Sequence, residues 1–435
     1  MPSDVANRPT LDGAPADEYA PLLEVEHLHT TFRVAGGTVK AVDDVSLRLE
    51  RGRSLGIVGE SGSGKSVLSR SIMGLVASNA VRSGSIRYQG VDLMALSPKQ
   101  LRGYWGTQLS MVFQDPMTAL NPVMRIGQQI IEPLRVHMSL SRADAKATAL
   151  ALLTSVGIPE AARRLRQYPH EMSGGMRQRV MIAIALACGP NLLFADEPTT
   201  ALDVTVQAQI LDLLAAQQRD RFMAMVLVTH DLGVVAGRAD EIAVMYAGRI
   251  VEQASSLDLF RHTRHPYTEA LLRSIPRLEN PSHTRLAAIS GRPPDLLHPP
   301  QGCKFAARCP RVQDHCREVE PDLIDDGNGH LYRCWYPVDL NARDVAGVAF
   351  GETVVTKVAV ATSVTAAAPP PPATEPAPPA ATEPPPPASP PPPPSGDDAL
   401  PDTDDPHTHR RLRVQRRRDR PLQARKSRPK HGEGD

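Results

Sequence analysis

Residues 59–66 read Gly59-Glu60-Ser61-Gly62-Ser63-Gly64-Lys65-Ser66 and match the pattern G-x-x-x-x-G-K-[ST]. They follow a short apolar run, Ser54 to Val58, and precede a stretch with helical spacing, Lys65 to Leu75. A glycine-rich turn from a strand into a helix points backbone N–H groups at phosphate oxygens. We therefore expect a nucleotide phosphate-binding loop, in which Lys65 neutralises the β- and γ-phosphates of ATP and Ser66 completes the shell of a Mg²⁺ ion.

Two adjacent carboxylates follow a second apolar run, Leu192 to Ala195. Because ligands of open α/β sheets bind at the C-terminal ends of the strands, we expect Asp196 and Glu197 to lie beside the phosphate loop. Asp196 can hold Mg²⁺ through water, and Glu197 can polarise the water that attacks the γ-phosphate. The pair therefore predicts ATP hydrolysis.

The surrounding pattern predicts an α/β fold. Leu22 to Phe32 and Thr38 to Leu49 alternate as an antiparallel strand pair. The strand before Asp196 and a further strand, Met225 to Val228, flank the helix Thr205 to Gln218, which is the βαβ arrangement of a parallel sheet. From Ser97 to about Leu186 the spacing is mostly helical and predicts a helical insert.

The domain boundaries follow from changes in composition. Residues 366–394 are mostly proline and alanine, and 410–430 form a basic run; neither can bury a core. We predict a disordered N-terminal lead (1–21), an ATPase domain (22–262) with a helical subdomain (about 97–186), a cysteine-containing C-terminal subdomain (263–340), and a disordered proline-rich and basic tail (341–435).

The whole-chain composition excludes some classes of function. The 435 residues carry a net charge of +1, which favours neither nucleic acid nor a membrane surface as the main partner. The longest apolar candidate, Val180 to Cys188, is too short to span a bilayer, so we expect any membrane role to be peripheral. The N-terminus lacks the apolar region of a secretory signal, which predicts a cytoplasmic protein.

A further motif, Met172-Ser173-Gly174-Gly175-Met176-Arg177-Gln178, precedes the carboxylate pair. With that spacing the sequence resembles the ATP-binding-cassette (ABC) family, although Met172 and Met176 stand where the family usually has Leu and Gln. The resemblance implies an ABC nucleotide-binding domain whose Ser173, Gly174 and Gly175 begin a helix and contact the γ-phosphate held by a partner subunit. Hydrolysis then requires two chains.

The same resemblance implies roles for four more residues. Gln114, after a strand from Leu109 to Phe113, matches the glutamine that senses Mg²⁺ and the attacking water. His230 matches the histidine that contacts the γ-phosphate, and Asp203 matches the loop that communicates across the dimer. Phe32 matches the aromatic residue that stacks on adenine, with core packing as its alternative role.

Two longer segments narrow the resemblance to one branch of the family. Phe113 to Pro122 and His265 to Thr268, with Leu271-Leu272 shortly after, look like the ATPase subunits of oligopeptide and dipeptide importers, a branch that also imports nickel. This implies a second, homologous ATPase chain in a heterodimer, two integral-membrane permeases, an extracytoplasmic solute-binding protein, and a peripheral location at the cytoplasmic face of the inner membrane. Other readings are a non-transport cassette protein of DNA repair or translation, or a subunit that holds ATP without turnover.

Four of the five cysteines lie close together in the sequence, at Cys303, Cys309, Cys316 and Cys334. In a reducing compartment they favour a metal site over disulfides, and four reduced thiols are the alternative. The importer branch has a similar cysteine-bearing segment, and some members carry a [4Fe-4S] cluster. The resemblance therefore implies an iron–sulfur cluster, with Zn²⁺ as the alternative.

Overall fold

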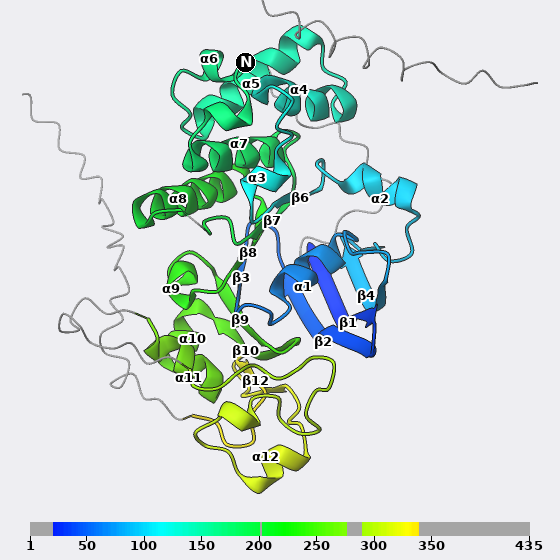
Figure 1. Ribbon diagram of the computed structural model, residues 1–435, viewed down its shortest axis with the longest axis vertical. Coiled ribbons are helices and arrows are strands. Elements are labelled where there is room, and N and C mark those ends of the chain that lie inside the picture. The colour runs from blue at the N-terminus through cyan, green and yellow to red at the C-terminus, as the bar shows by residue number, and fades with distance from the viewer. Residues whose placement is uncertain (1–20, 201, 276–288, 339–435) are drawn as a thin grey trace, which may run out of the picture. The chain divides into compact units, whose positions relative to one another are not determined.

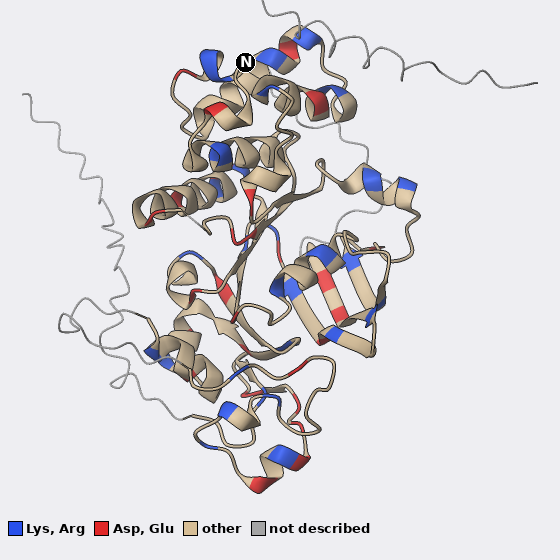
Figure 2. Ribbon diagram, in the orientation of Figure 1, with Lys and Arg blue, Asp and Glu red and all other residues tan. Residues whose placement is uncertain are grey.

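The computed structural model describes residues 21–200, 202–275 and 289–338 (Figure 1). The predicted tail and all but the last residue of the predicted lead lie outside the described residues. No helix of the described residues is long and apolar enough to cross a membrane. Basic and acidic residues are interspersed over the helices and both sheets (Figure 2).

The main sheet has eight strands in the order β11-β12-β10-β9-β3-β8-β7-β6. Its centre is parallel, as predicted. These strands are β9 (Glu241–Tyr246), β3 (Ser54–Val58), β8 (Ala224–Thr229), β7 (Leu192–Asp196) and β6 (Leu109–Val112). Four of them, β3 and β6 to β8, are buried along their whole length, which explains their continuous apolar runs.

The antiparallel sheet has the order β2-β1-β4-β5. The predicted pair forms β1 (Leu23–Val34) and β2 (Gly37–Leu49). The sequence did not indicate β4 (Ala80–Tyr88), which lies on the other side of β1, or the short β5 (Val91–Asp92). The central residues of β4 include Ser83-Gly84-Ser85, which weaken the strand signal.

Two hydrophobic cores cover the two faces of the main sheet. Alternate residues of β7 enter different cores: Leu193 and Ala195 pack with the helical region, and Leu192 and Phe194 pack with the antiparallel sheet. Helix α1 (Lys65–Ile72) belongs to the second core, and α8 (Val204–Arg221) belongs to the first (Figure 1).

The predicted helical insert contains short helices, of which the first precedes β6 and the others follow it. They are α2 (Pro98–Tyr104), α3 (Pro116–Ala119), α4 (Ile126–His137), α5 (Arg142–Ser155), α6 (Ala161–Arg164), the 3₁₀ turn η1 (Pro169–Glu171) and α7 (Gly174–Leu186). Helices α4, α5 and α7 contact one another, and α3 packs against α7.

After β8 the chain forms the short helix α9 (Leu232–Val235) and then β9. The next strand, β10 (Arg249–Ser255), pairs with β9 in antiparallel orientation. The helices α10 (Ser256–Arg261) and α11 (Pro266–Arg273) follow. The C-terminal segment, defined as residues 289–338, contains η2 (Ala306–Arg308), α12 (Asp314–Glu318), β11 (Ile324–Asp325) and β12 (Leu331–Tyr332). Because β12 pairs with β10, this segment extends the main sheet.

Candidate nucleotide site

The phosphate loop lies between β3 and α1 and is closely confined by backbone on two sides. A Cβ on Gly59 would lie 2.1 Å from the carbonyl oxygen of Met245, and a Cβ on Gly64 would lie 2.2 Å from that of Ala41. Gly64 also has φ 103°, which an L side chain rarely adopts. At Gly62, by contrast, a Cβ would meet no atom within 4 Å. The glycines therefore let the loop pass between β2 and β9 while one side stays open.

Lys65 is the first residue of α1, and its side chain is only 4% exposed. Its ammonium group donates to the carbonyl oxygens of Gly59 (2.7 Å) and Glu60 (3.0 Å) and lies 3.9 Å from Glu197 Oε1. Burial lowers the pKa of Lys65, and the nearby carboxylates oppose this shift. The loop thus contains a buried positive charge at its centre.

Ser66 and Asp196 form the oxygen pair expected of a magnesium site. Ser66 Oγ donates to Asp196 Oδ1 at 2.6 Å, and Arg70 lies 3.5 Å from the other carboxylate oxygen. Asp196 is fully buried, and burial raises its pKa despite the bond from Ser66. Hydroxyl and carboxylate oxygens are the ligands that Mg²⁺ prefers, and the buried Oγ of Ser63 in the same loop has no hydrogen-bond partner among the described residues. These residues fit a Mg²⁺–nucleotide complex.

Glu197 connects the other predicted catalytic residues. Its Oε2 accepts hydrogen bonds from Gln114 (2.9 Å) and from Thr200 (2.9 Å), and lies 3.5 Å from His230 Nδ1. The contact with His230 lowers the pKa of Glu197 and raises that of His230. Glu197 has φ 44°, a left-handed conformation that is uncommon outside glycine. The sequence did not indicate Thr200, because its hydroxyl reaches Glu197 only through the turn that follows Glu197.

The residues predicted to act on a partner's nucleotide lie together at the N-termini of two helices, and no hydrogen bond or ion pair among the described residues joins them to Lys65 or Glu197. Ser173 is the N-cap of α7 and accepts from the backbone N–H of Met176 (3.3 Å). Asp203 caps α8 in the same way. A Cβ on Gly175 would lie 2.8 Å from Val206, so the two helix N-termini are neighbours. Both Ser173 and Asp203 are exposed.

Phe32 is half-buried in β1, opposite Val39 of β2 and Ala80 of β4. Among the described residues, no hydrogen bond and no aromatic ring contact joins Phe32 to the phosphate loop. Its predicted stacking on adenine and its core-packing alternative therefore both stay predictions.

The C-terminal segment reaches the phosphate loop through Arg308. Its guanidinium group binds both carboxylate oxygens of Glu60, at 2.6 and 2.8 Å. The backbone N–H of Glu60 donates to the hydroxyl of Tyr267 at 2.8 Å. The sequence pointed to Tyr267 only as part of a family-like segment, and it did not indicate Arg308.

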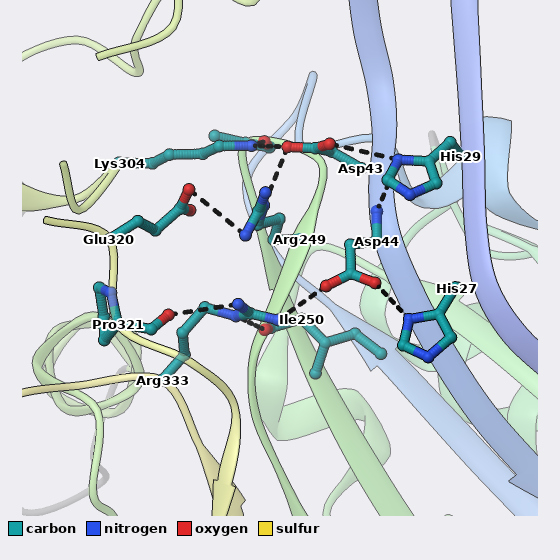
Figure 3. Close-up of polar contacts among 11 residues, drawn as sticks. His27, His29, Asp43, Asp44, Arg249, Ile250, Lys304, Glu320, Pro321 and Arg333 are labelled. Atoms are coloured by element: carbon teal, nitrogen blue, oxygen red, sulfur yellow. Dashed lines mark hydrogen bonds and ion pairs between the residues drawn. The ribbon is translucent and has the colours of Figure 1, made fainter. Parts of the chain in front are cut away.

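A buried ion-pair network attaches the same segment to β2 (Figure 3). Asp43 accepts from Lys304 Nζ at 2.8 Å and from Arg249 Nε at 2.9 Å. Arg333 lies 3.7 Å from Asp44. Burial opposes the charge on Asp43, but the bonds from Lys304 and Arg249 outweigh it, and the pKa of Asp43 falls well below its usual range.

The four predicted metal ligands line one small cavity of about 20 Å³, together with His265, Phe305 and Trp335. Burial raises the pKa of Cys303 to about 11 and that of Cys334 to about 12, so both are protonated thiols at neutral pH. Within the described residues, no three His, Cys, Asp or Glu side chains are spaced as ligands of one metal ion. The structure gathers the cysteines but does not arrange them as a ligand set.

A phosphate loop after one strand of a parallel sheet, together with a carboxylate pair at the end of another strand of that sheet, defines a P-loop ATPase. The chain matches the family "ABC transporter" over residues 42–200 and "Oligopeptide/dipeptide transporter, C-terminal region" over residues 251–316. It also resembles the dimeric ATP-binding cassette MJ0796 bound to ADP and Pi, with a TM-score of 0.50, 26% identity, and coverage of 54% of this chain and 98% of that one.

Curated relatives specify the group. The chain is 51% identical to the dipeptide transport ATP-binding protein DppD of Bacillus subtilis over 316 residues, which are 72% of this chain and 94% of the relative. It is 48% identical to the oligopeptide transport ATP-binding protein OppD of Escherichia coli, over 73% of this chain and 94% of the relative. The chain belongs to the ABC transporter family of ATPases, in the group of dipeptide and oligopeptide transport ATP-binding proteins.

Proposed function

We propose that the chain hydrolyses ATP to drive the import of short peptides, at the cytoplasmic face of the cell membrane. The observation that carries the ATPase role is a cluster of side chains, connected by hydrogen bonds and ion pairs, at the C-terminal ends of the parallel strands β3, β6, β7 and β8. Its members are Lys65, Ser66, Gln114, Asp196, Glu197 and His230. The printed names of the relatives, dipeptide and oligopeptide transport proteins, support peptides as the cargo.

In this proposal Lys65 and the N–H groups of the phosphate loop bind the β- and γ-phosphates. Ser66, Asp196 and Gln114 hold Mg²⁺, which when bound offsets phosphate charge. Glu197 accepts a proton from the water that attacks the γ-phosphorus as the bond to the ADP oxygen breaks. His230, which contacts the Glu197 carboxylate, orients that carboxylate. Its lowered pKa keeps Glu197 ionised and able to accept that proton.

A second cassette completes the site. Ser173 and its two glycines begin α7, where free N–H groups favour an anion, and they are not joined to this chain's own Lys65 by any hydrogen bond or ion pair of the described residues. We propose that they contact ATP on a homologous partner ATPase, with Asp203 at the same interface. Two permeases and an external solute-binding protein complete the importer.

We also propose that the four cysteines hold a [4Fe-4S] cluster. Their position around one cavity supports this, and a metal would deprotonate the thiols and draw them together. Iron and sulfide analysis of anaerobically purified full-length protein tests it, with Cys188→Ser as the control because Cys188 is buried in the core elsewhere, in the turn after α7. About four iron atoms per chain, lost in Cys309→Ser, is the expected result. Zinc alone, or no metal, would contradict it.

Uptake of radiolabelled dipeptides and oligopeptides tests the function. Cells that lack this ATPase would be complemented with the intact chain, with Lys65→Ala, or with Lys99→Ala, an exposed lysine in α2. We expect uptake with the intact chain and with Lys99→Ala, and none with Lys65→Ala. Uptake of nickel but not peptides, lost in Lys65→Ala, would overturn the cargo and leave the ATPase role in place.

A further inference from the structure

Arg308 is a buried arginine with a complete set of acceptors. Its side chain is 3% exposed. Besides the two bonds to Glu60, its terminal nitrogens donate to the Tyr246 hydroxyl (3.3 Å) and the Ile289 carbonyl (3.2 Å), and Nε donates to the Ser290 carbonyl (3.0 Å). All five N–H donors of a guanidinium group can thus be used, in a planar fork that lysine cannot reproduce.

Glu60 links Arg308 to Lys65, at the centre of the phosphate loop. Its carboxylate binds Arg308, its N–H binds the fully buried Tyr267, and its carbonyl oxygen accepts from Lys65 at 3.0 Å. One loop residue is therefore held at three points, and the last of these is the lysine that faces phosphate. A change in the position of Glu60 moves an acceptor of Lys65.

The aromatic rings behind Arg308 make this a rigid support. Tyr246 and Tyr267 lie 4.6 Å apart, and Phe305 lies 5.3 and 5.4 Å from them between ring centroids. All three side chains are buried. Arg308 lies 5.9 Å from the centroid of Tyr246, within the range of a cation–π contact. The packed rings limit where the guanidinium group can move and, with it, Glu60.

We propose that Arg308 is a positioning residue for the nucleotide site: by gripping Glu60, the C-terminal segment holds the phosphate loop in the geometry that binds ATP. The inference rests on the proposed role of Lys65 and the loop in binding phosphate. It assigns the C-terminal segment a direct part in nucleotide affinity, although that segment contributes no residue to the phosphate loop itself. When the contact between Arg308 and Glu60 is lost, Lys65 remains part of the loop, but Glu60 and the first residues of the loop can move from their positions.

The test measures binding of a fluorescent ATP analogue, with Mg²⁺, to the purified full chain. We expect Arg308→Gln to raise the dissociation constant about tenfold, a typical size for coupling between sites. Glu60→Gln should weaken binding less, because an amide oxygen still accepts one bond. The double variant should bind no worse than Arg308→Gln alone, because both changes remove the same contact.

Arg333→Gln is the matched control, because Arg333 is a buried arginine of the same segment that bonds to Ile250 and Pro321 instead of the loop. It should lower the melting temperature while the dissociation constant stays within about twofold, a difference of about 0.4 kcal/mol. Equal affinity losses in Arg308→Gln and Arg333→Gln would overturn the proposal, as would wild-type affinity in both Arg308→Gln and Glu60→Gln. Retained binding in Lys65→Ala would instead overturn the role of the loop.

Discussion

Lys304→Met should destabilise the fold by about 3 kcal/mol, because it removes one of two cations from a buried carboxylate. Lys304 and Asp43 have side chains that are each 6% exposed. Breaking a buried pair typically costs about 3–5 kcal/mol. We expect the lower end, because Arg249 still donates to Asp43 at 2.9 Å. The Ala247 carbonyl also loses the donor that binds it at 3.0 Å.

Urea unfolding, followed by the fluorescence of Trp105 and Trp335, measures this free energy. The control is Arg53→Met, which breaks the exposed pair with Asp240 and should cost less than about 1 kcal/mol. Adding Asp43→Asn to Lys304→Met should restore part of the loss, because it removes the unpaired charge. If Lys304→Met costs no more than Arg53→Met, the network does not hold the C-terminal segment in place.

Three further predictions concern the site and its support. Glu197→Gln should lower kcat for ATP hydrolysis by at least about 100-fold while ATP still binds, because the amide cannot accept the proton of the attacking water; phosphate release and nucleotide binding measure the two effects. Gly64→Ala should abolish nucleotide binding, since its Cβ would lie 2.2 Å from the Ala41 carbonyl, whereas Gly62→Ala, in open space, should only weaken it. Burial lowers the pKa of His265 to about 3, so between pH 6.5 and 5 only the unfolded chain gains its proton, and stability should fall by roughly 1.6 kcal/mol over that range. His265→Asn, which keeps a capping acceptor, should lose this part of the pH dependence in urea unfolding.

Each of these predictions has a contrary result. Hydrolysis at the wild-type rate by Glu197→Gln in the assembled complex would remove that residue from the chemistry. Equal binding losses in the two glycine variants would show that strain from positive φ, and not the contact with Ala41, limits the loop. An unchanged slope of stability against pH in His265→Asn would show that other groups set the acid sensitivity.

Local sequence patterns predicted the elements around the phosphate loop. The expected strand Ser54 to Val58 is β3, and the expected helix begins at Lys65 but ends at Ile72, before Leu75. It ends early because Gly74 follows with φ 72°. Motifs of this kind are readable because strand, turn and helix are consecutive in the chain. The carboxylate pair was readable for the same reason, since it directly follows a buried strand.

The contacts of the C-terminal segment were not readable from local patterns. Arg308 and Glu60 are separated by 248 positions, and Lys304 and Asp43 by 261. No periodicity connects residues so far apart, and an isolated Lys or Arg in a segment with little secondary structure resembles a solvated surface residue. The cysteines marked this segment as unusual, but their pattern indicated a metal and not a contact with the phosphate loop.

The seven residues from Cys303 to Cys309 contain both Lys304 and Arg308, the two side chains through which this segment contacts the surroundings of the phosphate loop. Lys304 binds Asp43 of β2 and the Ala247 carbonyl, in the turn between β9 and β10. The next residue of that turn, Gly248, donates to the Ser63 carbonyl at 2.9 Å, and Asp43 in turn donates to the Gly248 carbonyl at 2.8 Å. Arg308 binds Glu60, near the start of the loop. Because one short stretch contacts the loop directly at Glu60 and is linked to Ser63 through the turn at Gly248, we expect a change in its conformation to alter the position of the loop.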